Sequence, residues 1–141
     1  MPKLLIPVDD SESSIRLADH LFNKLAWYKE PVEIHLLNVR AALRGDVGMF
    51  IDAEQIRQFH HDEGLKVLAP IRERLDAAGV PYQIHIGVGD PAEVIVQYAR
   101  EAGCDEIVMG ASGRSPIAAL FMGSVPAKVL HHTDLPVLLI K

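Results

Sequence analysis

The sequence contains only one cysteine, Cys104, in 141 residues. A single cysteine can form neither an intrachain disulfide nor a cysteine-based zinc site, and its position at a turn before an apolar segment is typical of a small, half-buried residue. Long hydrophobic runs are also missing, because no apolar stretch reaches the roughly 18 residues needed to span a bilayer. The amino terminus leads directly into a strand-like segment at residues 3–6. We therefore expect a cytoplasmic protein that does not insert into a membrane.

Positive charge is scarce and dispersed. The chain has 14 Lys and Arg residues against 19 Asp and Glu residues, which gives a formal net charge of −5. A protein that binds a polyanion needs a local basic patch, and the basic residues here are scattered along the chain. Nucleic acid is therefore not an expected partner.

Three common motifs of nucleotide and acyl chemistry are absent. Gly123-Ser124 is followed by Val125, whereas a P-loop has a lysine next to its last glycine. The first apolar run leads into residues 7–10, P-V-D-D, where a dinucleotide-binding chain would have G-x-G-x-x-G. No G-x-S-x-G nucleophile elbow occurs. Lysine-assisted phosphoryl transfer, NAD or FAD binding and serine-hydrolase chemistry are not indicated, and we predict no catalytic residue.

Two histidine pairs, His60-His61 and His131-His132, invite a metal-binding interpretation. Adjacent residues on a helix point about 100° apart and rarely chelate one ion together. The second pair falls at the end of a predicted helix, where an imidazolium interacts favourably with the negative end of the helix dipole. We predict no metal site built from these side chains.

Short apolar or alternating runs predict five strands, at 4–8, 32–39, 82–86, 106–109 and 137–140. Helical spacing predicts helices at about 11–28, 53–78, 91–102 and 125–132. Strands that alternate with helices indicate a parallel sheet with helices on both faces and right-handed crossovers. The prediction is a single doubly wound, Rossmann-like α/β domain over residues 1–141, without internal repeats.

Several helix ends can be predicted from local chemistry. Asp90, Pro91 and Glu93 have the spacing of an N-cap, a first helical residue and a capping box. Gly79 stands where a left-handed C-cap is expected. Pro70 lies inside the second helical pattern and predicts a kink or a break. The first helix is expected to start from a cap at Asp10 or Ser11.

Glycines are concentrated where the chain is expected to contact a ligand. A buried strand ends at Gly110, Gly113 follows, and Gly123-Ser124 opens the last predicted helix, which gives the spacing G-x2-G-x9-G-S. Glycine allows the backbone to approach a ligand closely, and free N–H groups at a helix start attract anions. These features predict a phosphate-binding loop.

This motif, together with P-V-D after the first strand, G-D-P-A-E before the third helix and P-V-L-L-I at the end, resembles the universal stress protein family over the whole chain. The resemblance implies strand order 3-2-1-4-5 and an adenine nucleotide alpha hydrolase-like fold. Its ligand crevice would lie between the first and fourth strands, where the strand order reverses. The resemblance to the ATP-binding branch implies ATP as the ligand, with or without Mg²⁺ bridging the phosphates.

The resemblance also implies roles for residues around the base and the ribose. The Val39 backbone would meet the adenine edge, and Pro7 and Val8 would wall the base. Asp9 would accept a hydrogen bond from a ribose hydroxyl, although an Asp at this position also commonly caps the next helix. Gly110 would lie under the ribose.

For the phosphates, the resemblance implies backbone N–H groups of Gly113, Gly123 and Val125 and the hydroxyl of Ser124. Arg114 would add a cation, or remain solvated on an exposed loop. With Met109 at the end of the fourth strand, the predicted site comprises Pro7, Val8, Asp9, Val39, Met109, Gly110, Gly113, Arg114, Gly123, Ser124 and Val125.

The function implied by the resemblance is a non-enzymatic regulatory module of the stress response that changes its oligomeric or partner state on binding ATP. A weak ATPase is an alternative, for which only Asp9 or Asp10 is available as a base. A stress scaffold with a vacant site is a second alternative, and the intact glycines argue against it.

The last strand predicts an assembly. Residues 137–140 are apolar, and the expected order puts them at a sheet edge with only Lys141 following. A bare edge exposes unpaired N–H and C=O groups, so antiparallel pairing with a second copy is expected. We predict a homodimer through this strand, alone or within a larger oligomer. The alternative is that the irregular connection 40–52 covers the edge.

Overall fold

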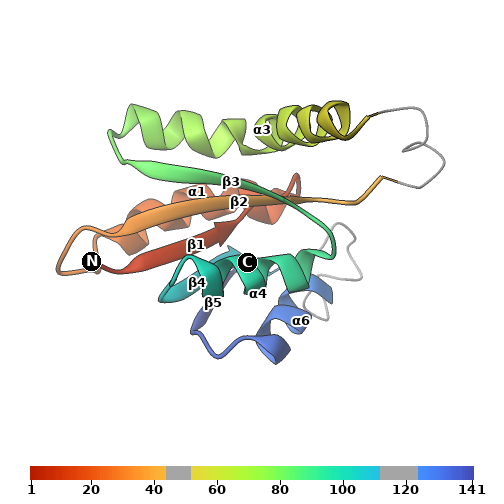
Figure 1. The fold of residues 1–141 in the computed structure, drawn as a ribbon. Coiled ribbons are helices and arrows are strands. Elements are labelled where there is room, and N and C mark those ends of the chain that lie inside the picture. The colour runs from red at the N-terminus through yellow and green to blue at the C-terminus, as the bar shows by residue number, and fades with distance from the viewer. Residues whose placement is uncertain (44–51, 112–123) are drawn as a thin grey trace.

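The computed structural model describes residues 1–43, 52–111 and 124–141. These residues form a five-stranded parallel sheet in the order β3-β2-β1-β4-β5 (Figure 1). This order and the α/β class confirm the predicted doubly wound fold. The strands are β1 (Lys3–Pro7), β2 (Glu33–Arg40), β3 (Tyr82–Val88), β4 (Glu106–Gly110) and β5 (Val137–Ile140).

Helices cover both faces of the sheet. The helices α1 and α3 contribute to one apolar cluster, and α4 and α6 contribute to the other (Figure 1). The described helices are α1 (Glu12–Leu25), α3 (Ala53–Ala77), α4 (Pro91–Glu101) and α6 (Ser124–His132). The predicted helices therefore form, with their ends shifted by up to three residues.

The two clusters arise from the period of two in the strands. Ile34 and Leu36 of β2 point into the α1/α3 cluster, and Leu37 points into the α4/α6 cluster. In β1, Leu4 and Leu5 are fully buried on opposite faces. A strand covered on both faces needs an unbroken apolar run, which is why this segment has no alternation.

The helix-cap predictions are confirmed in part. The Asp90 carboxylate accepts a hydrogen bond from the Glu93 N–H at 3.2 Å, and Pro91 is the first helical residue of α4. The reciprocal bond that would complete the capping box forms instead at the start of α3, between Asp52 and Gln55.

Helix α3 runs through Pro70 without a break. A proline removes one helical hydrogen bond, but Leu68 and Ile71 on either side of it are buried against the sheet. The predicted break is therefore wrong, since one continuous helix spans Pro70, and the predicted kink stays a prediction. Gly79 follows α3 with φ of 69°, as predicted for a left-handed cap.

The predicted irregular connection 40–52 lies largely outside the described residues, which resume at Asp52. Within the described residues, no helix combines the length and the hydropathy that a transmembrane segment requires.

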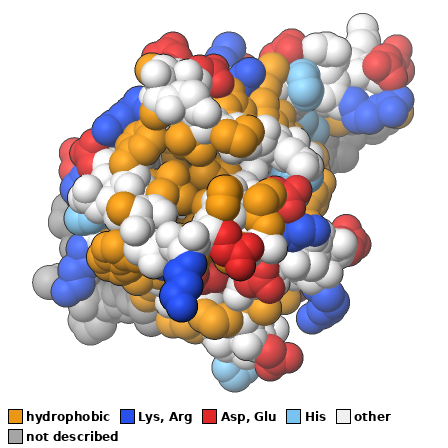
Figure 2. All heavy atoms as spheres, turned by 90° about the vertical axis from the view of Figure 1, so that its left-hand side faces the viewer, with side chains coloured by type: hydrophobic (Ala, Val, Ile, Leu, Met, Phe, Trp, Pro, Cys, Tyr) orange, Lys and Arg blue, Asp and Glu red, His pale blue; other side chains and the backbone are white. Residues whose placement is uncertain are grey.

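Figure 2 shows the end of the molecule at which β1 begins. Apolar side chains gather near the middle of this face, and acidic and basic side chains are interspersed around them. The connection between α1 and β2 lies at this end in Figure 1 and includes Trp27, which is 75% exposed. The predicted site lies at the opposite end, where the strands finish.

Candidate functional site

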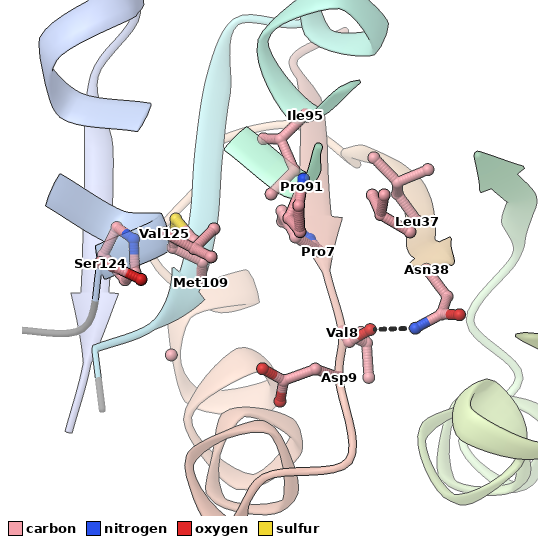
Figure 3. A pocket seen from close by; sticks show the side chains of 13 residues that line it. Pro7, Val8, Asp9, Leu37, Asn38, Pro91, Ile95, Met109, Ser124 and Val125 are labelled. Atoms are coloured by element: carbon pink, nitrogen blue, oxygen red, sulfur yellow. Dashed lines mark hydrogen bonds between the residues drawn. The ribbon is translucent and has the colours of Figure 1, made fainter. Parts of the chain in front are cut away.

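A pocket of about 340 Å³ opens at the carboxyl ends of β1, β2 and β4, where the strand order reverses (Figure 3). This is where doubly wound sheets bind ligands, because the crossovers diverge to opposite faces there. Its lining combines strand ends with the first turns of α4 and α6: Pro7, Val8, Asp9, Leu37, Asn38, Val39, Pro91, Ile95, Met109, Gly110, Ser124, Val125 and Pro126.

Eight of the eleven predicted site residues line this pocket. The structure brings them together from three strands and one helix, although they are far apart in the sequence: Pro7, Val8, Asp9, Val39, Met109, Gly110, Ser124 and Val125. The other three, Gly113, Arg114 and Gly123, lie outside the described residues.

Sequence reasoning missed five lining residues. Pro91 and Ile95 come from the first turns of α4, which Figure 3 shows next to Pro7. The G-D-P-A-E motif, which predicts this helix start and contributes to the family resemblance, is the sequence signal that contains Pro91 and lies next to Ile95. Leu37, Asn38 and Pro126 are neighbours of predicted residues along the chain.

The backbone N–H and C=O of Val39 lie at the end of the β1–β2 ladder, where β1 offers them no partner within its strand. The Val8 N–H donates to Leu37 O at 2.8 Å, and the Gly89 N–H donates to Arg40 O at 2.9 Å. Odd residues of β2 therefore direct their polar groups toward β1, and even residues direct theirs toward β3. Because β1 ends at Pro7, the N–H and C=O of Val39 point past the end of that strand, beside the pocket.

Asp9 is exposed, and its carboxylate is held by the start of α1. Oδ1 accepts hydrogen bonds from the Ser11 N–H at 2.9 Å, from the Ser11 hydroxyl and from the Ser14 hydroxyl at 2.8 Å. Ser11 is the N-cap residue of α1, but its side chain bonds Asp9 and caps no helical N–H. Asp9 therefore does not cap α1 in the way that the alternative interpretation expected, but its carboxylate is bonded to Ser11 and Ser14 at the helix start and lines the pocket.

Gly110 is required for a steric reason that the sequence did not reveal. A Cβ at Gly110 would lie 2.8 Å from Ser13 Cβ and 3.3 Å from the Ser13 carbonyl carbon. Gly110 is not among the described glycines with positive φ, which are Gly79, Gly89 and Gly103. The missing side chain therefore lets α1 pack closely against the end of β4.

The start of α6 supplies the polar end of the pocket. Ser124 is the first residue of this helix, and both Ser124 and Val125 line the pocket. The first N–H groups of a helix have no partner within the helix and carry partial positive charge. This end of the pocket can accept an anion.

A histidine pair lies between β2 and β3, near α4. Nδ1 of His35 and Nε2 of His85 are 2.8 Å apart, and the His85 ring packs edge-on against Tyr98. Burial, and secondly the charge that His35 can carry, lower the pKa of His85. Among the described residues, no group of three or more His, Cys, Asp or Glu side chains is arranged to hold a metal ion.

The fold and the pocket define a doubly wound α/β domain with a ligand-sized cavity at its topological switch point. The chain belongs to the universal stress protein family, whose family model matches residues 1–141. This finding confirms the resemblance inferred from the glycine spacing and the strand-end motifs.

Curated relatives and solved structures are similar to this protein over nearly its whole chain. Universal stress protein YxiE of Bacillus subtilis is 31% identical over 152 residues, which cover 99% of this chain and 98% of the relative. The solved structure of MJ0577, from Methanocaldococcus jannaschii, has a TM-score of 0.78 at 28% identity and covers 99% and 94% of the two chains. A universal stress protein solved in complex with cAMP has a TM-score of 0.72 at 26% identity and covers 99% and 97%.

Proposed function

We propose that this protein binds ATP in the switch-point pocket and acts as a regulatory module of the stress response rather than as an enzyme. The observation that carries the proposal is the arrangement of three unlike surfaces around one cavity: an apolar slot, the Asp9 carboxylate and the start of α6. The solved relative that holds cAMP supports the adenine nucleotide class.

The residues present fit each part of such a ligand. A cavity of about 340 Å³ is within the range of small-molecule sites, roughly 300 to 1,000 Å³. Pro7, Ile95 and Met109 give apolar walls for a base, and the Val39 backbone offers one donor and one acceptor for its edge. Asp9 provides an acceptor for a sugar hydroxyl.

The phosphates would lie at the start of α6, where Ser124 and Val125 provide N–H groups. The further roles of Gly113, Arg114 and Gly123 rest on the sequence motif. Mg²⁺, when present, would be held mainly by phosphate oxygens, since it binds through few carboxylates and retains several waters.

The direct test is mass spectrometry of nucleotide released from freshly purified protein. The expected result is an adenine nucleotide in near-stoichiometric amount, with ATP predominant. A protein that is purified free of nucleotide and also gives no heat of binding on titration with ATP would refute the proposal.

Turnover of ATP is expected to be absent or far below about 1 per second, the low end of ordinary enzymes. The chain has no P-loop lysine, and the described carboxylate that lines the pocket, Asp9, is the proposed partner of the ribose rather than of the phosphates. Phosphate release from purified protein with Mg²⁺ and ATP measures this rate. Hydrolysis near 1 per second that is lost in Asp9→Asn would support the weak-ATPase alternative.

The proposed working form is a homodimer joined through β5, alone or within a larger assembly. This strand pairs with β4 on one side and occupies the end of the strand order, and Val137, Leu138 and Leu139 are only half-buried. The cytoplasmic location and the absence of nucleic-acid binding stay predictions.

A further inference from the structure

The start of α1 forms a hydrogen-bond network around Asp9. Ser14 is bonded twice, because its hydroxyl donates to Asp9 Oδ1 at 2.8 Å and accepts from the Asp9 N–H at 3.0 Å. The Ser11 hydroxyl and N–H both donate to the same oxygen. A carboxylate oxygen offers two lone-pair sites, so three donors saturate Oδ1.

The network has a buried base. The hydroxyls of Ser11 and Ser13 lie 3.0 Å apart, and the Ser11 hydroxyl also donates to Asp9. Ser11, Ser13 and Ser14 are 8%, 1% and 7% exposed, whereas Asp9 itself is exposed. Hydrogen bonds from the buried hydroxyls of Ser11 and Ser14 therefore fix the orientation of an exposed carboxylate.

The second oxygen of Asp9 is left for a ligand. None of the hydrogen bonds among the described residues uses Oδ2, and Asp9 lines the pocket. Figure 3 shows the carboxylate directed toward the side of the pocket formed by Met109 and Ser124. The residue thus offers one fixed acceptor to a sugar bound between the base slot and α6.

We propose that Ser11 and Ser14 are positioning residues that make the site selective for nucleotides with free ribose hydroxyls. They hold Asp9 in one rotamer, so that Oδ2 meets a sugar hydroxyl without first losing side-chain freedom. The proposal rests on the proposed function and adds the sugar as the part of the ligand that the site reads. A nucleotide that lacks both hydroxyls gains nothing from this arrangement.

The test compares the calorimetric affinities of ATP and 2′,3′-dideoxy-ATP in four proteins. Wild type is expected to prefer ATP by about tenfold, the size of one hydrogen bond to a charged group. In Ser14→Ala this preference is expected to fall below about threefold, because the affinity for ATP drops and the affinity for dideoxy-ATP does not. Ser14→Thr keeps the hydroxyl and should restore the preference.

Thr133→Val is the matched control. Its hydroxyl also organises a turn, accepting from the Leu135 N–H at 3.1 Å, but it does not line the pocket. This variant should keep the wild-type preference. If Ser14→Ala does not fold, Ser11→Ala replaces it with the same expected loss of preference.

The outcomes separate the two claims. Wild type that binds neither nucleotide refutes the proposed function. Wild type that binds both equally, or Ser14→Ala that weakens both nucleotides by the same factor, overturns the positioning role while the proposed function stands. A uniform loss would show that Ser14 supports only the structure of the site.

Discussion

Replacing Val39 by tryptophan is expected to weaken ATP binding by about a hundredfold or more. Val39 is half-buried at the end of β2 and lines the pocket with Leu37 and Ile95 on the α4/α6 side of the sheet. An indole at this position would fill the slot proposed for adenine and cover the Val39 backbone groups. A β-strand accepts tryptophan readily, so the effect should fall on the cavity rather than on the strand.

Val88→Trp provides the matched control. Val88 ends the neighbouring strand β3, is 46% exposed and does not line the pocket. Isothermal titration of both variants, with circular dichroism to verify the fold, measures the difference. Wild-type affinity in Val39→Trp, or an equal loss in both variants, would contradict the proposed position of the base.

Leu139→Asp is expected to convert the dimer to a monomer. In the proposed pairing about a two-fold axis, each copy of β5 lies against the other, so the substitution introduces two carboxylates into one small interface. Like charges across paired strands are destabilising, and the edge loses apolar contact area as well. Sedimentation at micromolar concentration should show a wild-type dimer and a monomeric variant.

Two further variants make this result specific. Leu130→Asp changes an apolar side chain on α6 that is 42% exposed, and it should leave the dimer intact. Val137→Lys tests the same edge with a side chain that can reach solvent, in case Leu139→Asp disturbs the core it partly packs against. A monomeric wild type, or a dimer that persists in both edge variants, would rule out the interface.

The strands could be predicted because each one is encoded by the pattern of apolar residues within its own segment of the sequence. A strand buried on both faces must be apolar throughout, and this identified β1 and β5, the latter with the same limits in sequence and structure. The switch point then follows from the strand order that the family resemblance implied. For the same reason, strand-end residues such as Asp9, Val39 and Gly110 could be assigned to one pocket in advance.

Other features depend on contacts between distant segments. The reason for a glycine at position 110 is Ser13, which no motif connects to it. Pro91 and Ile95 reach the pocket because α4 connects β3 to β4 and so passes over the strands between them, which helical spacing alone does not predict. At Pro70, local propensity predicted a break that packing of α3 on the sheet overrides.

A crystal structure of the protein grown with ATP would show whether the nucleotide occupies the pocket between β1 and β4. We expect electron density with the adenine edge at the Val39 backbone, a ribose hydroxyl at Asp9 Oδ2 and the phosphates at the start of α6. Density for the nucleotide in another place, such as the smaller cavity near Lys66 and Arg74 between α1 and α3, would refute the proposed binding site. So would a pocket without nucleotide in crystals saturated with ATP.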